Sequence, residues 1–526
     1  MPLNTPFAGL LLALLCGTSL AASTLKYCSE ASPATFDPAQ TNSITDFDAS
    51  AHNVFNQLVQ TERGTLTLIP ALAERWEVSA DGLTYTFSLR RGVQFHSTAW
   101  FKPGRAFNAD DVLFTFQRLL DANHPFRKAY PTESPYVADY GLDKAITAVE
   151  KLDEFTVRFR LAKPMATFLL NLYSEFASIH SAEYAEQLLK AGTPEKIATQ
   201  PIGTGPFMFR SYQKDVAIRY AAHANYWNKE DARVDNLIFV ITPDKSVRVQ
   251  KLRSGECDIA AYPSPQDLVE LKKEPAFKIA AQTGNNVGYL AYNTQRSPFD
   301  KLDVRRALDM AINRQNILDT IYQGDAVLSQ TPVPPATWGH DATLKGAAYD
   351  PANARTLLDK AGVKDLKMEI WALPVQRAYN PNGRLMAEMI QSDWAKIGVK
   401  ASIVTMEWAE YLRRVKRGDH DAAMFGWTAS GDPDRFLSLL ACAGIDGNNI
   451  ARWCHPEYDG LVTKARQLTG EAQRAPLYKK AQTLFRQNLP WTPLAHGMLQ
   501  VPVRRNVQGF KTSPDGNMYF YGVTID

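Results

Sequence analysis

The run from residue 73 to residue 96 has the pattern of a β-hairpin. Tyr85, Phe87 and Leu89 are apolar at every second position, and Asp81-Gly82 provides a tight turn before them. We therefore expect strand, turn and strand, with one face of the hairpin buried.

Helices are predicted where capping residues precede apolar positions at helical spacing. Asn108 is a candidate cap, acidic residues follow it, and the apolar residues of that segment are Val112, Phe116 and Leu119. Asp350-Pro351 opens a second helix, with Gly362 just beyond its end, and residues 367–373 then have the pattern of a strand.

Strands and helices alternate along much of the chain. A strand at 234–242 precedes a helix at 246–252, and a strand at 399–405 precedes a helix at 409–415. This alternation predicts an α/β fold with mixed sheets. Neither a repeat nor a low-complexity linker is visible, so we expect the domains to be joined by several crossings of the chain.

Length and charge narrow the possible functions. The chain has 526 residues, 45% of them hydrophobic, which is enough for two or three domains with their own cores. Its 58 Lys and Arg residues balance 55 Asp and Glu residues without a basic arm, which argues against nucleic acid as a partner. Beyond the first 25 positions we find no apolar run of the roughly 18 residues that a membrane span needs.

The first 22 residues resemble an export signal. Residues 7–15 are almost wholly apolar, and small residues at Ser19 and Ala21 fit a cleavage site, although Lys and Arg are missing from this stretch. Cys16 suggests lipidation as an alternative, but bulky Leu15 stands where lipoprotein signals have a small residue. We expect a signal peptide at 1–22.

The cysteines of the mature chain predict disulfides. Four would remain after cleavage, namely Cys28, Cys257, Cys442 and Cys454, and an even number in an exported protein allows three pairings. The short spacing of Cys442 and Cys454 favours a local loop. A metal site is the competing interpretation, but the chain has no Cys-x-x-Cys pair.

Common enzyme signatures are missing from the sequence. It contains no Gly-x-Ser-x-Gly, His-Glu-x-x-His or phosphate-loop motif, and Gly203-Thr-Gly205 is a lone pair of glycines that we interpret as a turn. The nine histidines are scattered. An exported hydrolase with a site assembled from distant segments stays as an alternative.

Several uncommon runs carry a family resemblance. The hairpin and helix of 73–118, together with Pro201-Ile-Gly-Thr-Gly-Pro-Phe207, resemble the peptide, opine and nickel family of ABC-transporter solute-binding proteins. The following runs are similar to the dipeptide-binding branch of that family: 27–30, 101–103, 241–244, 286–290, 371–382 and 386–390. The likeness extends from about residue 25 to the C-terminus.

The resemblance implies a two-lobed periplasmic receptor with two hinge strands. Lobe I would comprise 23–54, 205–282 and 499–526, and lobe II would comprise 283–498. An extra subdomain, 55–204, would sit on lobe I and carry little of the ligand. The relatives' two bridges correspond here to Cys28 with Cys257 and Cys442 with Cys454.

The resemblance also implies the binding residues. Arg377 would grip the ligand's C-terminal carboxylate through two parallel N–H donors. Tyr379 belongs to the same motif, and Trp408 and Trp427 match tryptophans that could stack on the peptide.

The amine end departs from the family pattern. Relatives have an aspartate three positions after the second tryptophan, where it pairs with the ligand's ammonium, but here the loop is one residue shorter and Ser430 has that spacing. Either Asp432 moves inward to replace the missing charge, or the ligand is not an ordinary free dipeptide. Asp432 could equally be a turn residue before Pro433.

The sequence therefore predicts a non-catalytic periplasmic receptor, acting as a monomer without a cofactor or metal. It would bind a dipeptide or short peptide and deliver it to an inner-membrane ABC permease. Because the amine-anchoring aspartate is missing, a receptor of the same fold for haem, glutathione, an opine or a metal chelate is the alternative.

Overall fold

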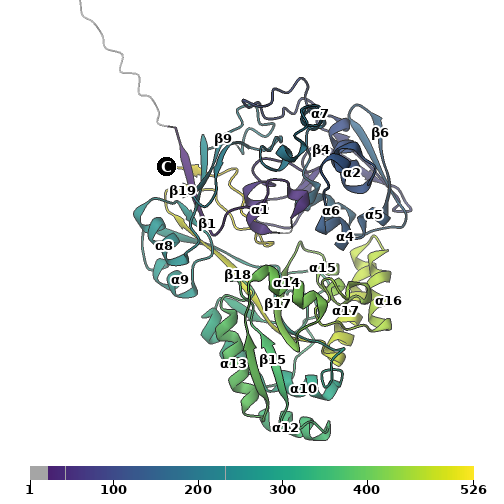
Figure 1. Ribbon diagram of the computed structural model, residues 1–526, viewed down its shortest axis with the longest axis vertical. Helices are drawn as coiled ribbons and strands as arrows, with labels where there is room; N and C mark the ends of the chain where they lie inside the picture. The colour runs from purple at the N-terminus through teal and green to yellow at the C-terminus, as the bar shows by residue number, and fades with distance from the viewer. Residues whose placement is uncertain (1–21, 42, 232) are drawn as a thin grey trace, which may run out of the picture.

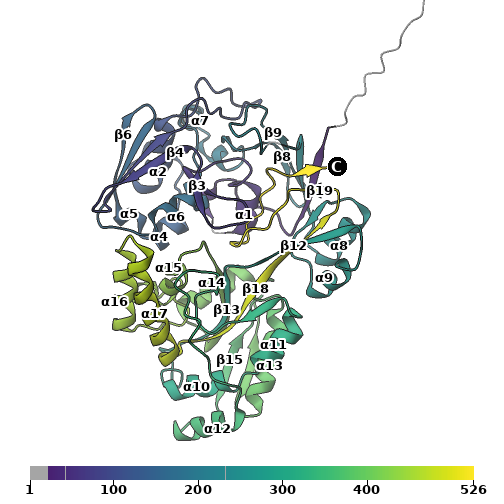
Figure 2. The same cartoon turned by 180° about the vertical axis from the view of Figure 1, so that it is seen from behind.

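The computed structural model describes residues 22–41, 43–231 and 233–526 (Figure 1). Residues 1–21, which include Cys16 and nearly all of the predicted signal peptide, lie outside this range. The described elements form two lobes and a third subdomain, which lies beside the first lobe in both views (Figures 1 and 2). We use the names lobe I, lobe II and extra subdomain for the residue ranges given above.

Lobe I is built from segments that are far apart in the sequence. Strand β1 pairs in parallel with both β10 and β11, and β9 and β8 continue the sheet beyond β10 in antiparallel fashion. The disulfide Cys28–Cys257 links β1 to the residues just before β11. The elements are β1 (Thr24–Ser29), α1 (Ile44–Ala49), β8 (Phe207–Gln213), β9 (Ala217–Ala222), β10 (Asn236–Ile241), α8 (Lys245–Ser254), β11 (Ile259–Ala260), α9 (Pro265–Leu271), β12 (Phe277–Thr283), β19 (Val507–Gln508) and β20 (Thr524–Ile525).

The extra subdomain has its own antiparallel sheet, in the order β4-β5-β7-β6. The hairpin predicted at 73–96 is confirmed as β4 and β5, with Tyr85, Phe87 and Leu89 buried. The elements are β2 (Val59–Thr61), β3 (Leu68–Pro70), β4 (Ala73–Val78), β5 (Thr84–Leu89), α2 (Ala109–Leu120), α3 (Pro125–Ala129), α4 (Pro135–Asp139), α5 (Leu142–Ala145), β6 (Ile146–Asp153), β7 (Thr156–Leu161), α6 (Phe168–Tyr173) and α7 (Ala182–Lys190).

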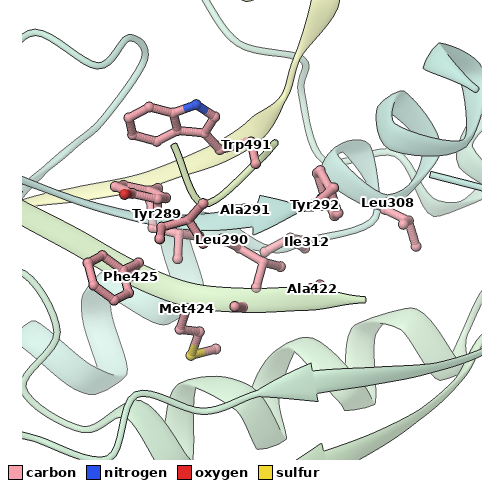
Figure 3. Close-up of a cluster of buried hydrophobic side chains, with 14 of the residues drawn as sticks. Tyr289, Leu290, Ala291, Tyr292, Leu308, Ile312, Ala422, Met424, Phe425 and Trp491 are labelled. Atoms are coloured by element: carbon pink, nitrogen blue, oxygen red, sulfur yellow. The ribbon is translucent and has the colours of Figure 1, made fainter. Parts of the chain in front are cut away.

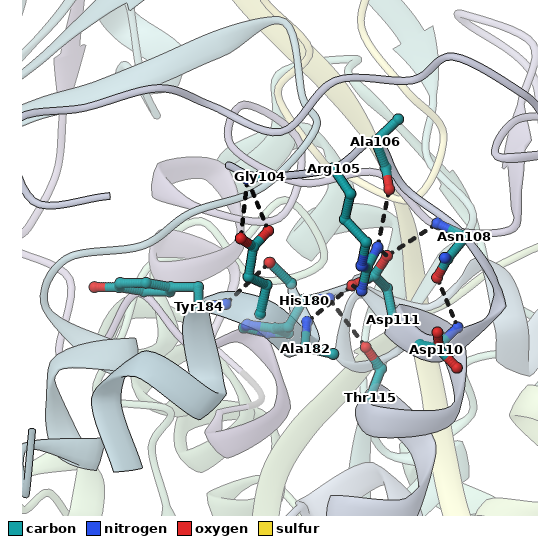
Figure 4. Close-up of polar contacts among 12 residues, drawn as sticks. Gly104, Arg105, Ala106, Asn108, Asp110, Asp111, Thr115, His180, Ala182 and Tyr184 are labelled. Carbon is teal, nitrogen blue, oxygen red and sulfur yellow. Dashed lines mark hydrogen bonds and ion pairs between the residues drawn. The ribbon is translucent and has the colours of Figure 1, made fainter. Parts of the chain in front are cut away.

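Helix α2 begins at the predicted cap. The Asn108 side chain accepts a hydrogen bond from the Asp110 amide at 2.9 Å, and the Asp111 carboxylate accepts one from the Asn108 amide at 3.0 Å (Figure 4). The same carboxylate receives two hydrogen bonds from Arg105 at 2.7 and 2.8 Å. These contacts fix the entry of the helix, whose Arg118 then pairs with Asp37 of lobe I through two bonds of 2.8 Å. The buried pair attaches the extra subdomain to lobe I.

Lobe II continues the lobe I sheet in the order β18-β13-β17-β15-β16. Its core lies where β13, β17 and the helices meet, and Tyr289 packs against Trp491 with ring centroids 3.7 Å apart (Figure 3). The disulfide Cys442–Cys454 closes a local loop. The elements are β13 (Asn286–Tyr292), α10 (Leu302–Met310), α11 (Arg314–Ile317), β14 (Ala326–Leu328), α12 (Pro351–Lys360), β15 (Lys367–Trp371), α13 (Gly383–Ala395), β16 (Lys400–Val404), α14 (Trp408–Arg417), β17 (Ala422–Thr428), α15 (Asp434–Leu437), α16 (Pro456–Arg466) and α17 (Glu471–Asn488).

Two neighbouring segments connect the lobes. The 14-residue strand β18 (Trp491–Arg504) pairs with β13 in lobe II and, further along, with β12 in lobe I. The chain passes from β12 to β13 directly beside it, because Thr283 is paired with Met498. Both segments run between the upper and lower bodies in Figures 1 and 2. The α/β two-lobed fold with mixed sheets is thus confirmed, with its crossings at the hinge strands.

Buried histidines make the stability of this fold depend on pH. Burial lowers the pKa of His180, His223, His420 and His496 from 6.5 to about 4. Between these pH values the unfolded chain binds protons that the folded protein does not, so the free energy of unfolding falls as the pH falls. Desolvation raises the pKa of several carboxyl groups, among them that of the buried Asp48, and these groups act in the opposite direction.

We expect the melting temperature at pH 5 to be lower than at pH 7 by about 5 °C or more. Calorimetry in buffers of equal ionic strength would measure the difference. An unchanged melting temperature between these pH values would contradict the assignment of neutral, buried imidazoles.

Candidate functional site

A cavity of about 280 Å³ lies where the two lobes and the extra subdomain meet. Lobe II supplies the wall that contains Arg377, Tyr379, Trp408, Trp427 and Ser430. The opposite wall comes from lobe I and the extra subdomain, through these residues: Ser43, Ile44, Phe47, Tyr262, Leu499, Asp515, Gly516, Asn517, Tyr136, Tyr140, Tyr173, Ser174 and Glu175. A ligand in this cavity would contact all three bodies.

Three glycines of adjacent strands position the loop that contains Arg377. A Cβ atom on Gly288 would lie 2.2 Å from the Tyr379 carbonyl oxygen, and one on Gly497 would lie 2.0 Å from the Ala378 carbonyl oxygen. A Cβ on Gly426 would lie 2.2 Å from the Tyr379 ring. The loop therefore rests on a surface of β13, β17 and β18 without side chains, which we call the glycine surface. Here only glycine allows such a close approach.

Arg377 is a partly exposed cation of the lobe II wall. Its guanidinium donates a hydrogen bond to the Gln376 carbonyl oxygen at 2.8 Å, and no carboxylate of the described residues lies within ion-pair distance of it. Arg377 also borders a second, mostly apolar cavity of about 80 Å³ beside β18. Most of its hydrogen-bonding capacity is therefore available to a bound anion.

Aromatic side chains form the rest of this wall. Trp408 is stacked on Tyr411 and Phe425, with ring centroids 5.8 and 6.1 Å away. Trp427 and Tyr379 line the cavity as well, and the Tyr379 carbonyl oxygen accepts a hydrogen bond from Tyr322 at 2.6 Å. The structure thus brings both tryptophans to the cavity together with Arg377.

The structure separates Ser430 from Asp432. Ser430 lines the cavity, whereas Asp432 is buried outside its lining and binds Arg474 through two hydrogen bonds of 2.7 and 2.8 Å. Desolvation raises the pKa of the Asp432 carboxyl, and Arg474 opposes that rise. The hypothesis that Asp432 moves into the amine site needs correction, because both of its oxygens are bound to a guanidinium of its own lobe.

Two acidic residues that the sequence analysis missed line the opposite wall. Glu175 follows helix α6 of the extra subdomain, and Asp515 lies in the C-terminal segment of lobe I. Asn517 lies between them, since its side chain donates to Glu175 at 2.7 Å and its backbone amide donates to Asp515 at 3.2 Å. These residues are about 340 positions apart in the sequence, so no local motif could have indicated them.

The extra subdomain forms more of the wall than the resemblance implies. Its Tyr136, Tyr140 and Tyr173 line the cavity. Arg435 of lobe II, itself buried and lining the cavity, donates to Asn171 at 2.5 Å and lies 3.9 Å from the centre of the Tyr140 ring. These contacts join lobe II to the extra subdomain at the cavity.

Metal ligation and membrane insertion find no support in the described residues. Their His, Cys, Asp and Glu side chains form no group that could hold a metal ion. Among the same residues no helix is both long and apolar enough to cross a bilayer.

Comparisons with known proteins agree with the two-lobed fold. The family model for bacterial extracellular solute-binding proteins, family 5, matches residues 67–448. Di/tripeptide-binding protein 1 of Pseudomonas aeruginosa is 55% identical over 507 residues, which cover 96% of this chain and 94% of that protein. Heme-binding protein A of Haemophilus influenzae is 44% identical over 506 residues, with 96% and 92% covered.

A solved structure extends the comparison. The dipeptide-binding protein of Pseudoalteromonas sp. SM9913 in complex with Met-Leu superposes with a TM-score of 0.89 at 37% identity, covering 96% of this chain and 100% of that one. The likeness therefore spans both lobes and the extra subdomain.

Proposed function

Because the chain belongs to family 5 of the bacterial extracellular solute-binding proteins, we propose that it captures dipeptides or short peptides for import. The relative from Pseudomonas aeruginosa is named for di- and tripeptides, and the relative from Pseudoalteromonas holds Met-Leu. The proteins of this family bind a solute for transport. We propose that this chain does the same and does not catalyse a reaction.

The observation that carries the proposal is the position of Arg377. Its guanidinium lies in the wall of a cavity between the lobes, without a carboxylate partner among the described residues. Two parallel N–H donors suit the planar carboxylate at a peptide's C-terminus, and exclusion of water strengthens such a charge-assisted pair. Trp408, Trp427 and Tyr379 would then pack against the peptide planes or side chains.

Haem is the second candidate, since a haem-binding relative is 44% identical. Haem iron is usually held by His, Cys, Met or Tyr side chains. The described lining of the cavity includes tyrosines but lacks His, Cys and Met. The cavity volume of about 280 Å³ is also just below the usual range for ligand sites, about 300–1,000 Å³, which favours a short peptide over the larger haem. Glutathione, an opine and a metal chelate are weaker candidates, because the missing aspartate is the only argument for them.

The remaining parts of the proposal follow from family membership. We infer that the mature protein acts in the periplasm as a monomer, with Arg377, Trp408, Trp427, Tyr379 and Ser430 around the ligand. An inner-membrane ABC permease would receive the loaded receptor. We also propose that the receptor acts without a cofactor.

Closure of the lobes on a peptide provides the test. We expect saturating Met-Leu, or a better member of a panel of di- and tripeptides, to raise the melting temperature by mass action and to reduce the radius of gyration in X-ray scattering. The same two quantities are measured with haem in place of the peptides. A panel in which every peptide leaves both quantities unchanged would contradict the proposal.

A further inference from the structure

The loop after Trp427 lacks a charge for a ligand's ammonium group. Ser430 offers only a hydroxyl to the cavity, and Asp432 is bound to Arg474 outside its lining. An ammonium buried without a carboxylate partner is strongly disfavoured. If the ligand is a peptide with a free amine, its counter-charge must come from another part of the cavity.

The described lining includes two carboxylates, and they differ in their partners. The Oε1 atom of Glu175 already accepts a hydrogen bond from Asn517 at 2.7 Å and lies 3.6 Å from the His52 imidazole. Asp515 has no Lys, Arg or His of the described residues within ion-pair distance. Asp515 is therefore the carboxylate whose charge is still unmatched.

The surroundings of Asp515 fix its orientation before any ligand arrives. The residue lies in a turn closed by the hydrogen bond from the Gly516 amide to the Ser513 carbonyl oxygen at 2.9 Å. Its carboxylate accepts a hydrogen bond from the Tyr173 hydroxyl, which lies 2.7 Å from the Tyr519 hydroxyl. Desolvation raises the pKa of Asp515, and a bound cation would relieve that cost.

We propose that Asp515 of lobe I binds the ammonium group of the ligand, opposite Arg377 of lobe II. The inference rests on the proposed function, because it assumes a zwitterionic peptide in the same cavity. Each end of the peptide is then bound by a different lobe, so the ligand connects the two opposite walls of the cavity. The free amine accordingly determines closure as well as affinity.

A double-mutant cycle tests this assignment. The affinities of Met-Leu and N-acetyl-Met-Leu are measured by calorimetry for the parent protein and for Asp515→Asn. We expect the parent to prefer the free amine by at least about 30-fold, and Asp515→Asn to bind both ligands with nearly equal, weak affinity. In X-ray scattering, Met-Leu should compact the parent, and the acetylated peptide should leave it open.

Glu175→Gln is the matched control in the same wall, and it should weaken the binding of both peptides to a similar extent. Asp515→Ala is measured alongside Asp515→Asn, so that a folding defect of one variant does not decide the outcome. Equal affinity of the parent for both peptides, or an undiminished preference for the free amine in both Asp515 variants, would overturn the inference alone. Failure of the parent to bind any peptide of the panel would instead overturn the proposed function.

Discussion

Replacing Arg377 with alanine should weaken peptide binding by roughly 30-fold to several thousand-fold. Removing one partner of a buried, hydrogen-bonded charge pair costs about 2–5 kcal/mol, because the ligand's carboxylate is left in the cavity without its donors. The fold should be little affected, since the contacts described for the Arg377 guanidinium are with nearby residues of its own loop, the Gln376 carbonyl oxygen and the Tyr379 side chain. Calorimetric titration with Met-Leu, combined with thermal unfolding, would measure both effects.

Two further variants sharpen this prediction. Arg377→Lys should recover only part of the affinity, because an ammonium cannot make the two-point contact of a guanidinium. Arg384→Ala is the matched control, since Arg384 is an exposed residue of the following helix that pairs with Glu388. If Arg377→Ala binds Met-Leu as tightly as Arg384→Ala does, the carboxylate anchor lies elsewhere.

Replacing Asp432 with asparagine should destabilise the protein by about 3–5 kcal/mol. Asp432 and Arg474 are almost wholly buried, and the change would leave the Arg474 guanidinium without its counter-charge. Urea unfolding would measure the loss. Asp303→Asn is the control, because Asp303 pairs with Arg306 at the surface and should contribute less than about 1 kcal/mol.

The ion pair and a role in ligand binding give opposite outcomes for Asp432. If Asp432 serves only in the ion pair, the folded Asp432→Asn variant should still prefer a peptide with a free amine. Combining Asp432→Asn with Arg474→Met should then recover much of the lost stability. A variant that unfolds like the parent but loses the preference for Met-Leu over its acetylated form would instead return Asp432 to the amine site.

The sequence was sufficient to predict those parts of the fold that depend on local pattern. The alternation around Tyr85 and the cap at Asn108 determine local structure, and both are present as predicted. Arg377, Trp408 and Trp427 were found because the runs around them resemble a family. Their arrangement in one wall depends on the sheet order, which neither spacing nor composition contains.

The missed residues show what a single sequence cannot contain. Asp515 meets Tyr173 and Glu175 meets Asn517 across 342 positions in each case, so their proximity is a product of the tertiary fold. The position of Asp432 stayed open in the sequence for a related reason. Its partner Arg474 is 42 residues away on α17, and the sequence gives no sign that this guanidinium enters the interior beside the loop.

The glycine surface has a consequence for how ligand preference can change. Any side chain on Gly288, Gly426 or Gly497 would collide with the loop that contains Arg377, so these three positions must stay glycine if that loop is to keep its place. In the opposite wall, Tyr173, Glu175 and Asp515 line the cavity with side chains instead of bare backbone. Substitutions in the wall that contains Asp515 could therefore change the ligand, while Arg377 continues to bind its carboxylate. A directed-evolution library should place its diversity at Tyr173, Glu175 and Asp515.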